Sequence, residues 1–233
     1  MPEEIMEKQV WMHLGLSERA QILLSAGSRH APVVDVDVAR RWFLERGVPV
    51  AGVFVDFHVA LGGVEYSVPG DRVCLGMWEW DVSGKPVAPN LWRDSQGKFR
   101  VTCGSIRAAQ VNISMREDGA IFEDGDPAYT SIVRCLEDHA VLEFVEQAFP
   151  QWPRLRLVVA AGQPIEKLGE LGGAVMTEAS DRLVVWWAGG DWFVRDGAMA
   201  PVDEGVRSVF VCARDVGTVE RVRVLLGEAI VEE

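Results

Sequence analysis

The sequence predicts an α+β fold, in which N-terminal helices pack on a curved antiparallel sheet and a C-terminal α/β extension or small second domain follows. Three observations lead to this prediction. Apolar residues recur at helical spacing over roughly the first sixty residues. Alternating segments separated by tight-turn sequences follow from Val64 onward. The proline-flanked segment 150–153, PQWP, then precedes a second group of strands and helices.

The N-terminal helices are predicted from apolar spacing and from residues that begin and end helices. Residues 3–25 show helical spacing, with Ser17 as the expected N-cap of a second short helix that ends at Gly27. Asp37 is the expected cap of the next helix, and Gly47 is expected to end it.

The stretch from Val53 to Tyr66 indicates a helix, a glycine stop and a strand. Its first part repeats apolar residues on one helical face, at Val53, Phe54, Phe57 and Leu61. Gly62 or Gly63 fits the left-handed position after a helix, where a side chain would clash. The segment 64–68 then alternates as a strand does.

The segment from Val73 to Ser114 is expected to form strands joined by turns at 83–86 and 94–97. Asp118-Gly119 predicts a β-hairpin. Asp126-Pro127 is then expected to be the N-cap and first residue of a long amphipathic helix. The apolar face of that helix consists of Tyr129, Ile132, Val133, Leu136, Ala140, Phe144 and Ala148.

We place the main boundary at residue 150, with an α+β domain over 1–150 and a small α/β domain or sheet extension over 151–233. The second part is expected to contain a strand over 155–160, a short helix over 165–171, two strands around Gly189-Gly190, a further strand and a helix after Asp215.

Composition limits the classes of function. The net charge of −12 argues against binding to nucleic acid, whose phosphates require a positive face. It is compatible with plain solubility or with a basic protein partner. No apolar run approaches the ~20 residues that a membrane span needs, and the acidic N-terminal sequence does not resemble a secretory signal. We therefore expect a cytoplasmic protein.

Residue chemistry gives no catalytic or metal motif. The four cysteines are scattered and are expected to be buried reduced thiols. Neither a nucleophile elbow nor a phosphate-binding loop occurs, so no cofactor is expected. The histidines are as scattered as the cysteines, so no metal site is expected either. A catalytic site assembled from distant residues stays open, with His58, His139 and the acidic loops as candidates.

The carboxylates are the recurring polar feature. Glu79 and Asp81 are two residues apart in an expected strand, so they would share one face, with Trp78 and Trp80 on the other. Helix capping, turn chemistry and a solvated outer face account for most of the acidic residues. The same residues would also suit a basic partner. The interface candidates are Glu79, Asp81, Glu123, Asp124 and Asp126.

Residues 36–145 resemble the SMI1/KNR4 (SUKH) superfamily. The resemblance rests on three stretches: ARRWFLERGVPV, then FVDFHVALGGVEY, then the hairpin and helix segment REDGAIFEDGDPAYTSIVRCLEDHAV. It covers about half of the chain. The chain departs from the family pattern at Val48-Pro49 and at Gly62-Gly63. The resemblance implies an α+β fold and a non-enzymatic role, since many bacterial members resemble immunity proteins that neutralise a cognate toxin, often a nuclease.

The first functional hypothesis is therefore an acidic binding protein of toxin-neutralising or regulatory type. The second is a hydrolase or transferase. The third is a structural or phage-derived assembly component, which a defined high-order oligomer in light scattering would support. A neighbouring toxin gene would favour the first, and a cleft that gathers a histidine and carboxylates would favour the second.

Overall fold

The computed structural model describes residues 13–48, 52–160, 165–197, 206–227 and 230–231. Helices and antiparallel sheets make up the chain, which confirms the α+β class. The chain divides into two compact units, Met1–Ala140 and Val141–Glu233, and the division falls inside helix α5 (Ile132–Ala148). The domain boundary that we place at residue 150 stays a prediction.

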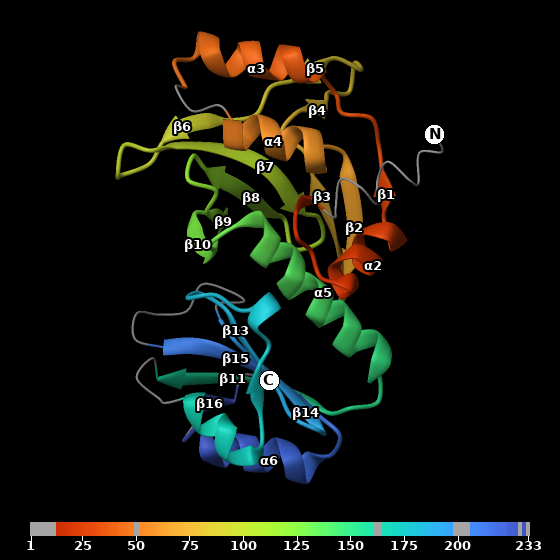
Figure 1. The fold of residues 1–233 in the computed structure, drawn as a ribbon, viewed down its shortest axis with the longest axis vertical. Helices are drawn as coiled ribbons and strands as arrows, with labels where there is room; N and C mark the ends of the chain where they lie inside the picture. The colour runs from red at the N-terminus through yellow and green to blue at the C-terminus, as the bar shows by residue number, and fades with distance from the viewer. Residues whose placement is uncertain (1–12, 49–51, 161–164, 198–205, 228–229, 232–233) are drawn as a thin grey trace. The chain divides into compact units, whose positions relative to one another are not determined.

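The first unit is built on an eight-stranded sheet (Figure 1). Its strand order is β1-β2-β3-β7-β8-β9-β10, β6 pairs with β7, and every pair is antiparallel. A separate two-stranded sheet joins β4 to β5. The strands are β1 (Ser28–Arg29), β2 (Val64–Val68), β3 (Asp71–Leu75), β4 (Glu79–Trp80), β5 (Pro86–Val87), β6 (Leu91–Arg93), β7 (Phe99–Ile106), β8 (Val111–Arg116), β9 (Ile121–Glu123) and β10 (Asp126–Tyr129).

Among the described residues, three helices precede the main strands of this unit: α2 (Glu18–Ala26), α3 (Val36–Glu45) and α4 (Gly52–Leu61). Figure 1 shows α4 between α3 and the strands of the sheet. Phe43 of α3 stacks on Phe54 of α4 at 5.2 Å between ring centroids, and both side chains are fully buried. The apolar stripes predicted for the two helices therefore face each other.

The glycine pair after α4 has the predicted role. Gly62 donates its N–H to the carbonyl of His58, and Gly63 takes a φ of +80°, which confirms the left-handed stop. Gly63 also donates to the carbonyl of Leu75 and accepts from the N–H of His30, both at 2.8 Å. The glycine therefore ends the helix and joins three segments of the first unit.

Two predicted helix starts need correction. The cap of α3 is Asp35 rather than Asp37, because the Asp35 side chain accepts the N–H of Val38 and the helix begins at Val36. Asp126-Pro127 does not open a helix. These residues belong to β10, where Asp126 pairs with Glu123 across the β9–β10 turn, and α5 begins at Ile132.

The second unit has its own six-stranded sheet of order β12-β13-β14-β15-β11-β16. Its strands pair antiparallel throughout the part that the structure describes, and the two large sheets share no described strand pair. The elements are β11 (Arg154–Ala160), η1 (Ile165–Leu171), β12 (Ala174–Val175), η2 (Thr177–Ala179), β13 (Val185–Ala188), β14 (Trp192–Asp196), β15 (Val206–Ala213), α6 (Val216–Leu225) and β16 (Ile230–Val231).

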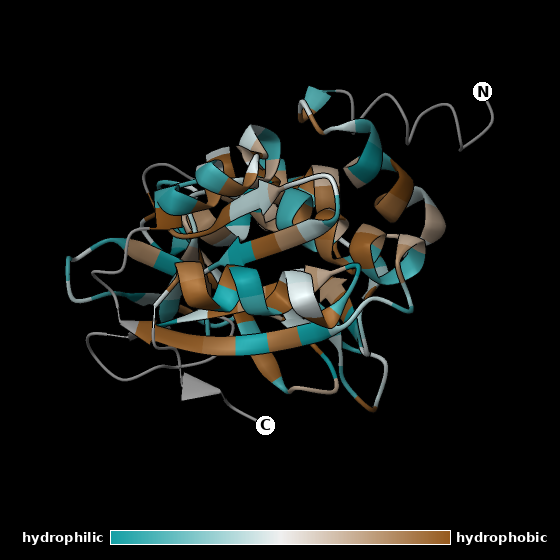
Figure 2. Cartoon of the chain, turned by 90° about the horizontal axis from the view of Figure 1, so that it is seen from below, coloured by the Kyte–Doolittle hydropathy of each residue, from teal (hydrophilic) through white to brown (hydrophobic). Residues whose placement is uncertain are grey.

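The core of the second unit gathers apolar residues of the sheet, of η1 and of α6, among them Leu157, Leu168, Val194 and Val222. Trp186 is fully buried, and its neighbour Trp187 packs partly buried against this core. Figure 2 shows hydrophobic and hydrophilic residues alternating along the same helices and strands, as expected of elements that bury one face.

Candidate functional site

The five acidic residues predicted for an interface lie in two separate places of the first unit. Glu79 is on β4 and Asp81 follows it in the β4–β5 turn. Glu123, Asp124 and Asp126 lie together around the β9–β10 turn. Figure 1 places the two hairpins at different ends of the first unit, so the five residues do not form one surface.

Asp81 has a structural role in its turn. Its carboxylate accepts the backbone N–H groups of Ser83 and Lys85, at 2.8 and 2.9 Å, and the Ser83 hydroxyl at 2.7 Å. These hydrogen bonds, first the one from Lys85, lower the pKa of Asp81. Asp124 acts in a similar way, because its side chain accepts the N–H of Asn112 at 2.8 Å. Asp81 thus stabilises its own turn, and Asp124 ties the β9–β10 turn to strand β8.

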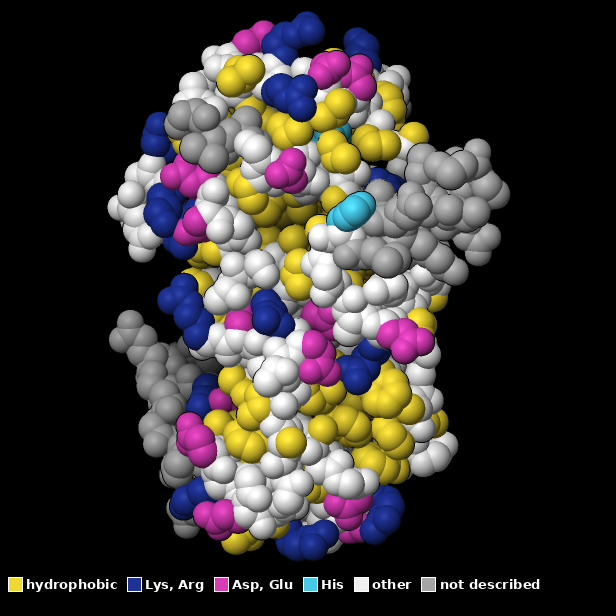
Figure 3. Space-filling model, viewed as in Figure 1, with side chains coloured by type: hydrophobic (Ala, Val, Ile, Leu, Met, Phe, Trp, Pro, Cys, Tyr) yellow, Lys and Arg dark blue, Asp and Glu magenta, His cyan; other side chains and the backbone are white. Residues whose placement is uncertain are grey.

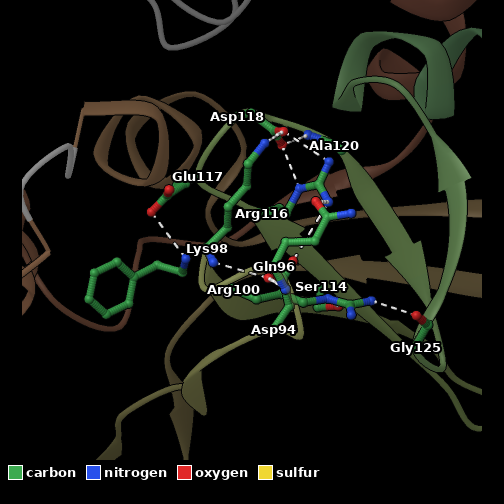
Figure 4. A network of polar contacts seen from close by, with 11 residues as sticks. Asp94, Gln96, Lys98, Arg100, Ser114, Arg116, Glu117, Asp118, Ala120 and Gly125 are labelled. Atoms are coloured by element: carbon green, nitrogen blue, oxygen red, sulfur yellow. Dashed lines mark hydrogen bonds and ion pairs between the residues drawn. The ribbon is translucent and has the colours of Figure 1, made fainter.

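Charge does not single out a patch on the face that Figure 3 presents, where acidic and basic side chains are interspersed. Figure 4 shows one reason, a network around the β6–β7 and β8–β9 turns. Asp118 pairs with Lys98 and Arg116 at 2.8 and 2.9 Å. Partial burial works against ionisation of Asp118, but the hydrogen bonds from Arg116, Lys98 and the Ala120 N–H outweigh it and hold its pKa well below the usual range.

The β4–β5 hairpin differs from the other turns because it exposes apolar side chains. Trp80 is 58% exposed, Val87 is 47% exposed and Val82 is fully exposed. The expectation that Trp78 and Trp80 share a face is wrong. The strand β4 contains only Glu79 and Trp80, so Trp78 precedes it and does not follow its alternation. The Trp78 side chain is buried, and its ring centroid lies 5.5 Å from that of Trp42.

A cavity of about 500 Å³ adjoins this hairpin. Its lining comes from the segment after β1, the end of α4, the facing ends of β2, β3 and β7, and β4 itself. Both Glu79 and Trp80 line it. We call the hairpin residues Glu79, Trp80, Val82 and Val87 together with this cavity the hairpin site. Its other polar lining residues are His30, His58, Glu65, Cys74, Ser105 and Arg107.

Strand register places the polar lining in one row. Glu65 of β2 is opposite Cys74 of β3, and Cys74 is opposite Ser105 of β7. Arg107 donates from Nε to the Cys74 sulfur at 2.9 Å and from Nη2 to Glu65 at 3.3 Å. Arg72 lies 3.5 Å from the same carboxylate. The cationic side chains beside Glu65 are therefore already paired with it.

Cys74 is the partly exposed cysteine, whereas the other three are buried, and all four are free thiols. Burial raises the pKa of the Cys74 thiol, although the hydrogen bond from Arg107 works in the other direction. The thiol is therefore held in its protonated form, which is the less nucleophilic one.

His58 lines the cavity and has an unpartnered acceptor, Nδ1, which is itself buried. The residue is 3% exposed, and its Nε2 lies 2.9 Å from the carbonyl oxygen of Val34, so Nε2 carries the proton and donates it. Nδ1 then bears a lone pair, and no group among the described residues donates to it. The Trp78 ring lies 5.1 Å from the imidazole.

His139, the other candidate histidine, belongs to the core. It lies in a run of three buried polar residues in α5, Glu137, Asp138 and His139. Nδ1 of His139 is 2.8 Å from the Tyr66 hydroxyl, and the Tyr129 hydroxyl donates to Asp138 at 2.8 Å.

Glu137 of the same run accepts both the N–H and the hydroxyl of Ser17, each at 2.6 Å. Hydrogen bonds made by residues 137–139 thus connect α5 to the N-cap of α2, to β2 and to β10. Sequence reasoning did not find this role, since helical spacing indicates only the apolar face of α5.

The described residues contain no group of three or more histidine, cysteine or acidic side chains arranged to hold a metal ion. Within the same residues, no helix is long and apolar enough to cross a lipid bilayer. A comparison with known protein families, curated proteins and solved structures finds no match to this chain.

Proposed function

We propose that this chain is a non-enzymatic binding protein of the immunity type, which neutralises a basic toxin such as a nuclease, and that it binds through the hairpin site. The observation that carries the proposal is the exposure of Trp80, Val82 and Val87 on a two-stranded hairpin beside Glu79. Tryptophan is among the residues that contribute most to the binding energy of protein interfaces. Apolar side chains exposed together on a surface often mark an interaction site.

The net charge of −12 supports a basic partner. A field of one sign steers an oppositely charged protein toward it and raises the association rate. Glu79 adds a local reason, because none of the described residues forms a hydrogen bond or ion pair with its carboxylate, and an incoming cation would supply one.

The test begins with the full chain immobilised and exposed to extract of its native organism, and each captured protein is identified and expressed with and without the chain. We expect one captured protein to stop growth and degrade nucleic acid when alone, and to be silenced by the chain. Trp80→Ala and Glu79→Lys should weaken that protection at least tenfold, because interface tryptophans and unpaired charges are costly to lose.

Glu170→Lys is the matched control, since it makes the same charge change on an exposed residue of η1 in the second unit. It should leave protection unchanged. Full protection by Glu79→Lys and Trp80→Ala, or the absence of any captured protein that the chain silences, would contradict the proposal.

A second candidate function is supported by the cavity itself, which gathers two histidines, a thiol and two glutamates. In this reading the Nδ1 lone pair of His58 is a general base. Against it, the thiol pKa is raised, and no described hydrogen bond joins His58 to Cys74 or to a carboxylate. Rapid labelling of Cys74 by an electrophilic probe, lost in a His58→Asn variant that stays folded, would favour the enzyme over the binding protein.

A further inference from the structure

The groups of the hairpin site that have no described partner share one chemical property. His58 Nδ1 is a buried lone pair without a donor, and Glu79 is an exposed carboxylate without a described hydrogen bond or ion pair. Trp80 lines the same cavity and exposes more than half of its surface. All three attract a hydrogen-bond donor or a cation: a lone pair, a negative charge and the electron-rich face of an aromatic ring.

The arginine that lines the same cavity, Arg107, is already engaged. It is bound to Cys74 and Glu65, and Arg72, which is not part of the lining, lies within ion-pair distance of Glu65. The pKa of Arg107 is raised mainly by its hydrogen bond to Cys74, and Glu79 contributes least to that shift. The unpaired character of the cavity is therefore negative, even though its formal charges nearly balance.

We propose that the cavity of the hairpin site binds an arginine side chain of the partner protein, which lies against Trp80 and pairs with Glu79. This inference rests on the proposed function and specifies the chemistry of the partner. The cavity volume of about 500 Å³ is ample for one long side chain with part of its backbone.

Arginine suits the site better than lysine. Its guanidinium is planar, so it stacks on an indole while its edge donates to a carboxylate. Its five N–H donors also let one group reach two acceptors at once, whereas an ammonium acts as a compact point charge that prefers water.

The experiment uses the full chain labelled with nitrogen-15 and the peptide N-acetyl-Gly-Arg-Gly-amide as the probe. The indole N–H signal of Trp80 is assigned from the Trp80→Phe variant and followed during titration. We expect a saturable shift with a dissociation constant on the order of 1 mM, as suits a single side chain in a half-open cavity.

Two peptide arms and two variants make the result decisive. The lysine peptide should bind several-fold more weakly, and the citrulline peptide, which is neutral but nearly isosteric, should give no saturable shift. Glu79→Gln should weaken arginine binding about tenfold, because a charged hydrogen bond is lost. Glu170→Gln, on an exposed residue of the second unit, should leave it unchanged.

Three results would overturn the inference: no saturable shift of Trp80, equal binding of the arginine and citrulline peptides, or an unchanged affinity in Glu79→Gln. Equal binding of lysine would overturn the choice of arginine. The titration and the protection assay can fail independently. If the chain silences a toxin but does not bind the arginine peptide, the arginine site is rejected and the proposed function stands. If the chain binds the arginine peptide but silences no toxin, the proposed function is rejected and the arginine site stands.

Discussion

Replacing Gly63 by alanine tests how the first unit is held together. A Cβ built on Gly63 would lie 2.3 Å from the backbone oxygen of His30, far inside contact distance, and the backbone φ of +80° already disfavours a side chain. Gly70 offers a matched control in the β2–β3 turn, because its φ is +74° and nothing lies within 4 Å of its Cβ.

The two substitutions share one cost and differ in another. The left-handed conformation costs a non-glycine residue about 1 kcal/mol in both variants. In Gly63→Ala the backbone at position 63 must also move away from His30. This movement would break or weaken the two 2.8 Å hydrogen bonds that Gly63 makes with His30 and Leu75. At about 1 kcal/mol for each bond, we expect Gly63→Ala to cost about 3 kcal/mol and Gly70→Ala about 1 kcal/mol.

Urea unfolding followed by tryptophan fluorescence measures the free energy of unfolding, and native-state hydrogen exchange of the β2 and β3 amides reports the first unit itself. An unchanged dependence on urea would show that only stability has changed. If the two variants differed by less than about 0.5 kcal/mol, the contact with His30 would not be the reason for glycine at position 63.

Three further predictions concern the first unit and the thiols. Ser17→Ala should lower the free energy of unfolding by about 1–2 kcal/mol in urea, because it removes a helix cap and a donor to buried Glu137, whereas Ser17→Thr should cost less. The pKa of Asp118 is lowered in the folded chain, so its contribution is present above about pH 4 and is lost as the pH falls below that value. The stability gap between wild type and Asp118→Asn should shrink on acidification, and a constant gap would contradict this. A chromogenic thiol reagent should modify Cys74 first in the native chain and all four cysteines in denaturant, while four equal native rates would contradict the described burial.

Local signals in the sequence predicted where α2 and α6 begin. Ser17 caps α2, and the helix expected after Asp215 begins at Val216. Both outcomes depend on side chains that reach backbone groups only three residues ahead, as Asp215 does with Thr218. Signals of this range need no knowledge of the rest of the fold.

Where two local choices competed, pairing at longer range decided. Asp126-Pro127 has the chemistry of a helix start, but the hairpin that Asp118-Gly119 begins continues into a third strand and takes these residues as β10. The helix α3 starts two residues earlier than we predicted, because Asp35 caps it in place of Asp37.

The hairpin site was only partly predictable. Glu79 was named from charge, but the cavity depends on Glu65, Cys74 and Arg107, and the bond from Arg107 to Cys74 joins residues 33 positions apart. Alternation along β2 and β3 places Glu65 and Cys74 on the same face, which is the signal that was available. The resemblance to the SMI1/KNR4 superfamily stays a prediction.

Hydrogen–deuterium exchange on the full chain, alone and in complex with the protein that it silences, tests directly whether the hairpin site binds the partner. We expect slower exchange in the complex at residues 76–88, which span the β4–β5 hairpin and one wall of the cavity. Protection confined to other segments, such as η1 and α6 of the second unit, with unchanged exchange across the hairpin, would contradict it.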